Sequence, residues 1–152
     1  MRLISSLLLL VIDVTAHGFG IGANLVTFPR DFDSQNTNRA GVILNYKDRY
    51  LLVQNKFSFR WSFTKGHVEP FDVNLLETAQ REVKEESGYL EHEHYVIDDT
   101  QPRIYGKSTY WTGTVISPDP PKLKEDEHLG FGWFTKDEMR KLKTTTDITE
   151  WL

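Results

Sequence analysis

The sequence predicts one α/β domain, in which a mixed sheet carries a helix on each side. Two observations support this fold class. Short apolar runs of strand character bracket stretches with the periodicity of amphipathic helices, and each expected helix begins at a capping residue. The 152 residues are 39% hydrophobic and 12% aromatic, which is ample for a single core. We place the domain at residues 39–152, after an N-terminal extension of residues 1–38.

The N-terminal extension has two interpretations. A basic start, an apolar run over residues 3–14 and small residues up to Ala16 have the layout of a secretory signal peptide, residues 1–16. The apolar run is too short to span a membrane. The alternative is a buried strand or helix that covers the sheet, since Asp13 interrupts the run. Residues 28–38 are polar and are expected to form a linker.

The strands are expected on both sides of the first helix. Residues 40–45 and 50–54 are apolar runs separated by four polar or aromatic residues, which is typical of a hairpin. Further strands are expected at residues 108–116 and 129–134, with a loop at residues 118–121, where prolines exclude a central strand.

The first helix is expected from about residue 75 to residue 87. Asn74 can cap it, Glu77 can complete a capping box, and Gly88 supplies the left-handed residue that ends it. At 3.6 residues per turn, one face is apolar and is expected to pack on the core. That face consists of Leu76, Ala79 and Val83.

A second helix is expected near the end of the chain. Thr135 and Glu138 form another capping box, and the helix after it should include Met139 and Leu142.

Glu82, Glu85 and Glu86 share another face of the first helix, and we expect them to point outward. Like charges at this spacing destabilise a helix by roughly 0.2–0.5 kcal/mol per pair, and Arg81 and Lys84 offset only part of this. A hard divalent cation such as Mg²⁺ would turn the repulsion into binding and would also take phosphate oxygens. The alternative is a solvated helix face of mixed charge. With the glycine turn expected at Gly66, the cluster favours metal-dependent hydrolysis of a polyphosphate.

The segment from residue 66 to residue 89 resembles the signature of the Nudix hydrolases. That signature is a glycine, five residues, a glutamate, seven residues, and then Arg-Glu-hydrophobic-x-Glu-Glu-x-Gly-hydrophobic. It is filled by Gly66, Arg81, Glu82, Val83, Glu85, Glu86, Gly88 and Tyr89. The resemblance implies an α/β/α sandwich with a mixed sheet and a catalytic loop-helix.

The loop half of the signature departs from the family. Fourteen residues separate Gly66 from Arg81 instead of thirteen, and Asp72 stands in place of the family's loop glutamate. In the family that glutamate pairs with the signature arginine or binds metal through water. Asp72 is one methylene shorter and one residue out of register, so Glu69 and Glu77 are alternatives for this role.

The residues around the signature are similar to those of the animal-type asymmetrical diadenosine tetraphosphate hydrolases, over residues 39–142. The matches are Trp61, residues 65–70 and 76–79, Tyr110-Trp111, Glu127-His128 and Trp133, whereas Phe63 and Thr64 replace two prolines. This resemblance implies cleavage of diadenosine tetraphosphate to ATP and AMP. Alternatives are hydrolysis of an mRNA cap, an RNA 5′ end or a diphosphoinositol polyphosphate. Another is a nucleotide-binding module whose altered loop has abolished turnover.

The resemblance also implies the metal site. Mg²⁺, or Mn²⁺, would be bound by Glu82, Glu85 and Glu86, with the Gly66 carbonyl as a further ligand. Glu127 would be an additional ligand or base, and a solvated surface charge is the alternative. Glu85 and Glu86 are the preferred direct ligands, whereas Glu82 is either a ligand or the general base. The remaining catalytic residue, Arg81, is expected to brace the loop and not to touch substrate.

Five residues are expected to bind substrate. Lys65, at the expected glycine turn, is placed to reach a phosphate oxygen. His67 and Lys107 are candidates for contacts with the polyphosphate, although solvated surface is the alternative for Lys107. Tyr110 is the main candidate for stacking on adenine. His128 is a further aromatic candidate, as are Trp61, Trp111 and Trp133, for which core packing is the alternative.

The net charge and the cysteine content limit which partners are expected. The net charge is −4 and there is no cysteine, so neither a global basic surface for nucleic acid nor a disulfide framework is present in the sequence. We expect a dinucleoside polyphosphate substrate, no stable nucleic-acid partner, no membrane span and a monomer. The location is cytoplasmic by resemblance, or secreted if residues 1–16 act as a signal peptide.

Overall fold

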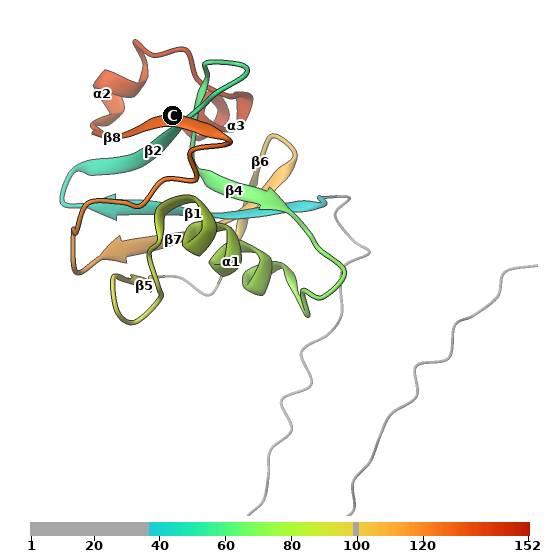
Figure 1. Ribbon diagram of the computed structural model, residues 1–152. Coiled ribbons are helices and arrows are strands. Elements are labelled where there is room, and N and C mark those ends of the chain that lie inside the picture. Colours follow the sequence, from blue (N-terminus) through green and yellow to red (C-terminus); the bar gives the residue numbers. More distant parts are fainter. Residues whose placement is uncertain (1–36, 99–100) are drawn as a thin grey trace, which may run out of the picture.

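The computed structural model of the chain describes residues 37–98 and 101–152 (Figure 1). The expected signal peptide and the linker up to residue 36 lie outside the described residues. Within the described ranges, α1 (Leu75–Ser87) covers one face of a mixed sheet, whereas α2 (Lys136–Met139) and α3 (Thr146–Trp151) cover the other. The predicted α/β/α sandwich is therefore confirmed.

The described residues form a sheet of eight strands, in which the order β3-β2-β1-β7-β5 forms the main path. The strands are β1 (Arg39–Tyr46), β2 (Arg49–Asn55), β3 (Trp61–Ser62), β4 (Thr64–His67), β5 (Tyr95–Ile97), β6 (Arg103–Tyr105), β7 (Ser108–Val115) and β8 (His128–Phe134). Off the main path, β4 pairs with β1, β6 with β7, and β8 with β2. The sheet is mixed because β1 pairs with β7 in parallel and with β2 and β4 in antiparallel orientation.

The predicted hairpin of β1 and β2 is confirmed. Asn45 pairs with Tyr50 and Tyr46 with Arg49, which leaves a two-residue turn. Its first residue, Lys47, has a φ of 58°, as tight hairpin turns require.

Helix α1 begins and ends at the predicted residues. The Asn74 side chain accepts a hydrogen bond from the Glu77 N–H at 2.9 Å, and Gly88 has a φ of 75°. One detail of the capping box differs, because the Glu77 carboxylate accepts from the N–H of Val73 at 2.5 Å and not from that of Asn74. The predicted apolar face is confirmed, since Ala79 and Val83 are fully buried and Leu76 packs against the same core cluster.

The core lies on both faces of the sheet because successive residues of β1 point in opposite directions. Val42 and Leu44 pack under α1, whereas Ile43 packs with Met139 of α2 and Ile148 of α3. This alternation fixes α1 against β1 and β4 and therefore fixes where its carboxylates lie.

The structure differs from the sequence-based expectations in several elements. The capping box at Thr135 is present, but α2 ends at Met139, before Leu142. Helix α3 and the short strands β3, β4, β5 and β6 were not predicted. Gly66 lies within β4 and not in a turn. In the described ranges, no helix has the length and apolar character needed to cross a membrane.

Candidate active site

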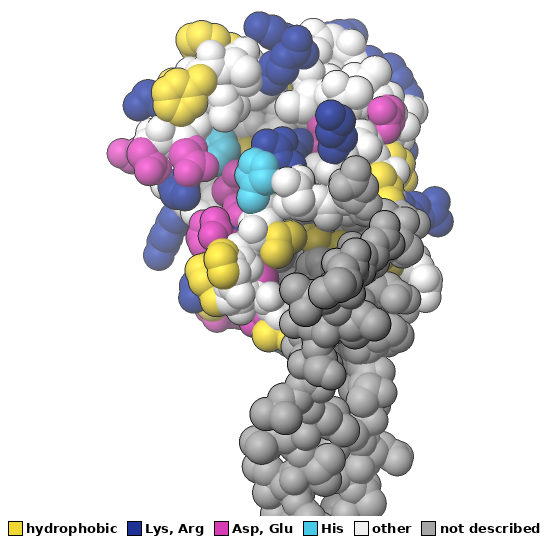
Figure 2. Space-filling view, turned by 90° about the vertical axis from the view of Figure 1, so that its right-hand side faces the viewer, with side chains coloured by type: hydrophobic (Ala, Val, Ile, Leu, Met, Phe, Trp, Pro, Cys, Tyr) yellow, Lys and Arg dark blue, Asp and Glu magenta, His cyan; other side chains and the backbone are white. Residues whose placement is uncertain are grey.

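Five of the eight predicted signature residues line one cavity of about 450 Å³, between α1, β4 and the segment that precedes β8. They are Gly66, Arg81, Glu82, Glu85 and Glu86. Its carboxylates are Glu69, Glu82, Glu85, Glu86 and Glu127, and its cationic side chains are Arg39, Lys65, Arg81 and Lys124. On one face of the molecule, acidic, basic and histidine side chains gather beside one another (Figure 2). Carboxylates thus lie together inside the cavity with positive charges around them.

Gly66 leaves space for the Glu82 side chain, which reaches from α1 to β4. A Cβ atom added at this position would lie 2.1 Å from the carboxylate carbon of Glu82, so this carboxylate, at the end of a flexible side chain, would have to move. The signature glycine therefore makes room for a glutamate and does not form a turn.

Asp72 takes the place of the family's loop glutamate. Its two oxygens accept hydrogen bonds from Arg81 Nε at 3.0 Å and Nη2 at 2.9 Å, in a bidentate pair. Asp72 also accepts from the N–H of Glu69 and from the Thr78 hydroxyl. The hydrogen bonds from Arg81 hold the pKa of Asp72 at about 2, below its ordinary value of 3.8. The extra loop residue is thus accommodated, and neither Glu69 nor Glu77 replaces Asp72.

Arg81 connects the loop to the carboxylates of α1. It donates to the His67 carbonyl at 2.8 Å, to Glu82 at 2.7 Å and to Glu85 at 3.2 Å. One guanidinium therefore offsets part of the repulsion among the glutamates while it braces the loop. Burial raises the pKa of Glu82, although Arg81 opposes this rise.

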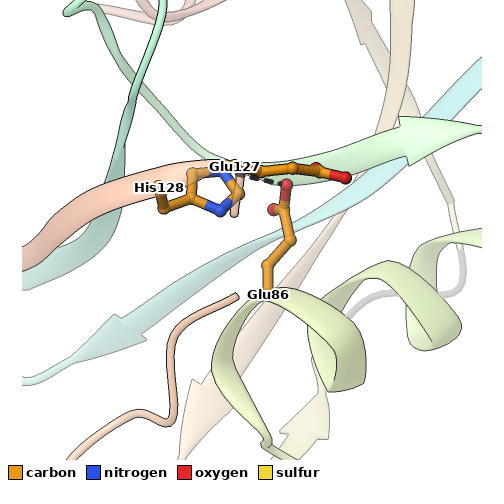
Figure 3. Close-up of side chains that lie close together, drawn as sticks. All are labelled: Glu86, Glu127 and His128. Carbon is orange, nitrogen blue, oxygen red and sulfur yellow. Dashed lines mark ion pairs between the residues drawn. The ribbon is translucent and has the colours of Figure 1, made fainter. Parts of the chain in front are cut away.

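The expectation that Glu82, Glu85 and Glu86 all point outward is wrong for Glu86. Glu85 is exposed, but Glu86 is only 6% exposed, and its Oε2 accepts from the Lys65 N–H at 3.0 Å. Its other oxygen, Oε1, lies 3.3 Å from His128 Nε2 in an ion pair (Figure 3). Burial raises the pKa of Glu86. Burial also disfavours the imidazolium of His128, but the hydrogen bond and charge of Glu86 outweigh this and raise the pKa of His128.

The candidate metal ligands meet at Glu86. Ligand atoms of Glu86, Glu127 and His128 all lie within 4.8 Å of one another, and Figure 3 shows the two other side chains approaching Glu86 from the segment that begins β8. Carboxylate oxygens are the donors that Mg²⁺ prefers, and a cation would compensate the buried charge of Glu86. Glu82 and Glu85 line the same cavity. The residues present therefore fit a divalent cation.

The expectation that Tyr110 stacks on adenine is wrong, because its ring is buried and offers no stacking surface. The residue is 2% exposed, its ring packs against Phe63 at 5.6 Å, and its hydroxyl donates to Asp147. His128 is also buried and contacts Glu86 instead of presenting a ring to substrate. The tryptophans pack in the core: Trp61 on the side of the sheet covered by α2 and α3, and Trp111 and Trp133 on the side covered by α1.

The three predicted polyphosphate contacts are placed differently from one another. Lys65 Nζ is paired with Asp147 inside the protein, so its charge is already compensated. His67 is exposed at the cavity, where its Nε2 accepts from Arg39 Nε at 2.9 Å. Lys107 lines a second cavity of about 590 Å³, which shares Arg39 and Lys65 with the first.

Sequence reasoning missed two groups of site residues. Arg39 and Lys124 bring positive charge to the cavity, and Lys124 Nζ lies 2.7 Å from a Glu127 oxygen. Asp147 stands on α3, a helix with no sequence signal strong enough to predict it. Neither Arg39 nor Lys124 lies in the signature, and the ion pair of Asp147 joins residues 82 apart in the sequence, so no local signal marks them.

The comparisons with known proteins agree with this arrangement. The chain is 35% identical over 81 residues to the uncharacterized Nudix hydrolase YfcD of Shigella flexneri, which covers 50% of this chain and 43% of that relative. The matched part of this chain therefore corresponds to less than half the length of these curated relatives. It also resembles a C. elegans Ap4A hydrolase in a binary complex, with a TM-score of 0.61 and 26% identity over 69% of this chain and 85% of the other.

A third similarity, to another solved structure, shows a shared fold only. The NUDIX domain of Shewanella oneidensis NrtR, solved with ADP ribose, has a TM-score of 0.57 at 18% identity, and the match covers 82% of this chain and 88% of the other. The NUDIX domain family itself matches residues 35–152. With the charged signature residues gathered around one cavity, this match shows that the chain belongs to the Nudix hydrolase family.

Proposed function

We propose that the chain hydrolyses nucleoside polyphosphates with Mg²⁺ or Mn²⁺, and specifically that it cleaves diadenosine tetraphosphate to ATP and AMP. The observation that carries the proposal is the cavity in which the α1 carboxylates converge with Glu127. The likeness at 26% identity to the C. elegans Ap4A hydrolase supports this substrate over other polyphosphates.

Glu86 and Glu127 would hold the cation, with Glu82 and Glu85 in the same cavity. His128 would join them only as a neutral imidazole, after giving up the proton of its ion pair with Glu86. When bound, such an ion neutralises phosphate charge and lowers the pKa of a coordinated water. Arg39 and Lys124 attract the polyphosphate, because both cations line the cavity. Arg81 keeps the loop and the glutamates in position.

Glu82 is the residue that we assign as general base. Its carboxylate lies against Gly66 inside the cavity, and burial raises its pKa, which makes it a stronger base than a solvated glutamate. Glu82 would take the proton from the water that attacks phosphorus. Arg81, at 2.7 Å, keeps the carboxylate oriented.

The runner-up is a nucleotide-binding module without turnover. The altered loop motivates this alternative, but the bidentate pair of Asp72 and Arg81 supports the enzyme instead, since the loop and helix remain connected.

The test is incubation with Mg²⁺ or Mn²⁺ and diadenosine tetraphosphate, capped RNA or ADP-ribose, with product analysis. Glu86→Gln removes a candidate ligand and should abolish product, whereas Glu93→Gln, at an exposed glutamate outside the cavity, should leave turnover unchanged. Release of ATP and AMP supports the proposal. Cleavage of another substrate alone would refute the substrate, and binding without any cleavage would refute the enzyme.

We also propose that the chain acts as a monomer in the cytoplasm, unless residues 1–16 direct secretion. Sedimentation of the purified protein and fractionation of cells that express the full chain test these two points.

A further inference from the structure

The segment between β2 and β3, residues 56–60, which we name the aromatic loop, carries two exposed phenylalanines. Phe57 is 77% exposed and Phe59 is 57% exposed. Phenylalanine is among the residues most often buried, so two exposed rings within three positions require an explanation.

The aromatic loop is held in a fixed shape. Asn55 Oδ1 accepts hydrogen bonds from the N–H groups of Phe57 at 3.0 Å and Ser58 at 2.9 Å, and Lys143 Nζ donates to the Ser58 carbonyl. Phe59 has a φ of 58°, a conformation that a bulky side chain adopts only when its surroundings impose it. The rings are therefore presented to solvent by an ordered scaffold, and binding of a ligand does not require the loop to be ordered first.

The aromatic loop is attached directly to the candidate active site. The N–H of Lys56 donates to the Glu127 carbonyl at 2.8 Å, and Asn55 is the strand partner of His128. Consecutive Cα atoms are about 3.8 Å apart, so Phe57 cannot lie far from these two candidate ligands. On the face drawn in Figure 2, hydrophobic side chains lie beside the acidic and histidine side chains.

The loop also stands between the two cavities. Ser58 lines the first cavity, which holds the carboxylates, and Arg60 lines the second, which also contains Lys107. Arg39 lines both. A phosphate chain that runs from the carboxylates toward these cations would therefore lie beside the aromatic loop, whose two phenylalanines stand outside both cavities.

We propose that Phe57 and Phe59 form a platform on which the base of a nucleoside polyphosphate stacks. The inference rests on the proposed function, because it assigns the recognition of the same substrate. The phosphates match the cations of both cavities, whereas the base is uncharged and planar and matches an exposed aromatic surface. The aromatic loop thus takes the part that the sequence assigned to Tyr110, whose ring is buried.

The test separates the base from the phosphates. The double variant Phe57→Leu/Phe59→Leu keeps apolar side chains but removes both aromatic faces. For the wild type and the variant we would measure kcat and KM for diadenosine tetraphosphate, and the inhibition constant of inorganic tripolyphosphate, which has no base. Ile116→Ala, at an exposed apolar residue beyond β7, is the control and should change none of these.

We expect the double variant to raise KM for the dinucleotide between about 5-fold and 150-fold, the range that stacking of one base gives. Its kcat and the inhibition constant of tripolyphosphate should stay within about twofold of wild type. An unchanged KM would overturn the inference. A parallel rise of KM and of the inhibition constant would also overturn it, because the loop would then act on the phosphates. Loss of self-association in the double variant at an unchanged KM would overturn the inference as well, because the loop would then make contacts between copies of the chain.

The same variant separates this inference from the proposed function. If the wild-type chain hydrolyses no substrate, the proposed function fails, and calorimetric binding then decides the inference alone. Binding of diadenosine tetraphosphate that weakens in the double variant, with tripolyphosphate binding retained, supports the platform. Absence of nucleotide binding by the wild-type chain overturns it.

Discussion

Asp72→Asn tests whether the altered loop is held by charge. The Asp72 side chain is 1% exposed, and its hydrogen bonds from Arg81 lower its pKa from 3.8 to about 2. One pKa unit corresponds to about 1.4 kcal/mol, so ionised Asp72 contributes about 2 kcal/mol to the free energy of unfolding at neutral pH. The amide of an asparagine side chain cannot carry the charge, and we expect the variant to lose this amount.

The pH dependence of the Asp72→Asn effect follows from the sign of the shift. Because the folded-state pKa lies below the unfolded value, the stabilisation is complete well above pH 4 and is lost as the pH falls through about 2. The gap between wild type and variant should therefore shrink to about half at pH 3. Urea unfolding followed by tryptophan fluorescence between pH 7 and pH 3 measures it.

The control for Asp72 is Asp48→Asn, an exposed aspartate in the turn between β1 and β2, which should change the free energy of unfolding by less than about 0.5 kcal/mol. A gap for Asp72→Asn that is absent at pH 7, or is the same at pH 7 and pH 3, would refute the reasoning.

Three further predictions concern single positions. Gly66→Ala should lower kcat about a hundredfold, because the new Cβ displaces the Glu82 carboxylate; a rate close to wild type would contradict this. Gly88→Ala should cost about 1 kcal/mol in thermal unfolding at unchanged kcat, since its φ of 75° suits glycine, and an unchanged Tm would count against it. Asp147→Asn should cost about 3 kcal/mol in urea unfolding, since Lys65 loses its partner in a nearly buried pair. The double variant with Lys65→Met should lose less than the sum of the single variants, and additivity would argue against the pair.

The local signals in the sequence predicted the central elements well. Asn74 and Gly88 delimit α1 because a cap and a left-handed glycine act within one turn of the helix. The hairpin of β1 and β2 is equally local. Strands of two to four residues, such as β3 and β4, show no periodicity of their own, so the turn expected at Gly66 is a strand that pairing with β1 defines.

The site was predictable as a list of residues but not as an arrangement. The burial of Glu86 depends on the N–H of Lys65 and on His128, both distant in sequence. Likewise, the burial of Tyr110 reflects a partner 37 residues away, Asp147. The resemblance identified which residue types belong to the site, but only tertiary packing decides which of these side chains reach solvent.

The pairing of β2 with β8 has a consequence for the order in which the protein folds. Helix α1 can form from local contacts, but Glu127 and His128 arrive only when the last strand docks. Contacts between segments so far apart in the chain form slowly. On a ribosome, α1 would therefore emerge with its glutamates still hydrated, and Glu86 would lose its water only after β8 has also emerged. If a divalent cation binds at Glu86 as we propose, a cation available at that moment would favour the docking of β8, and metal supply would then affect the yield of folded protein.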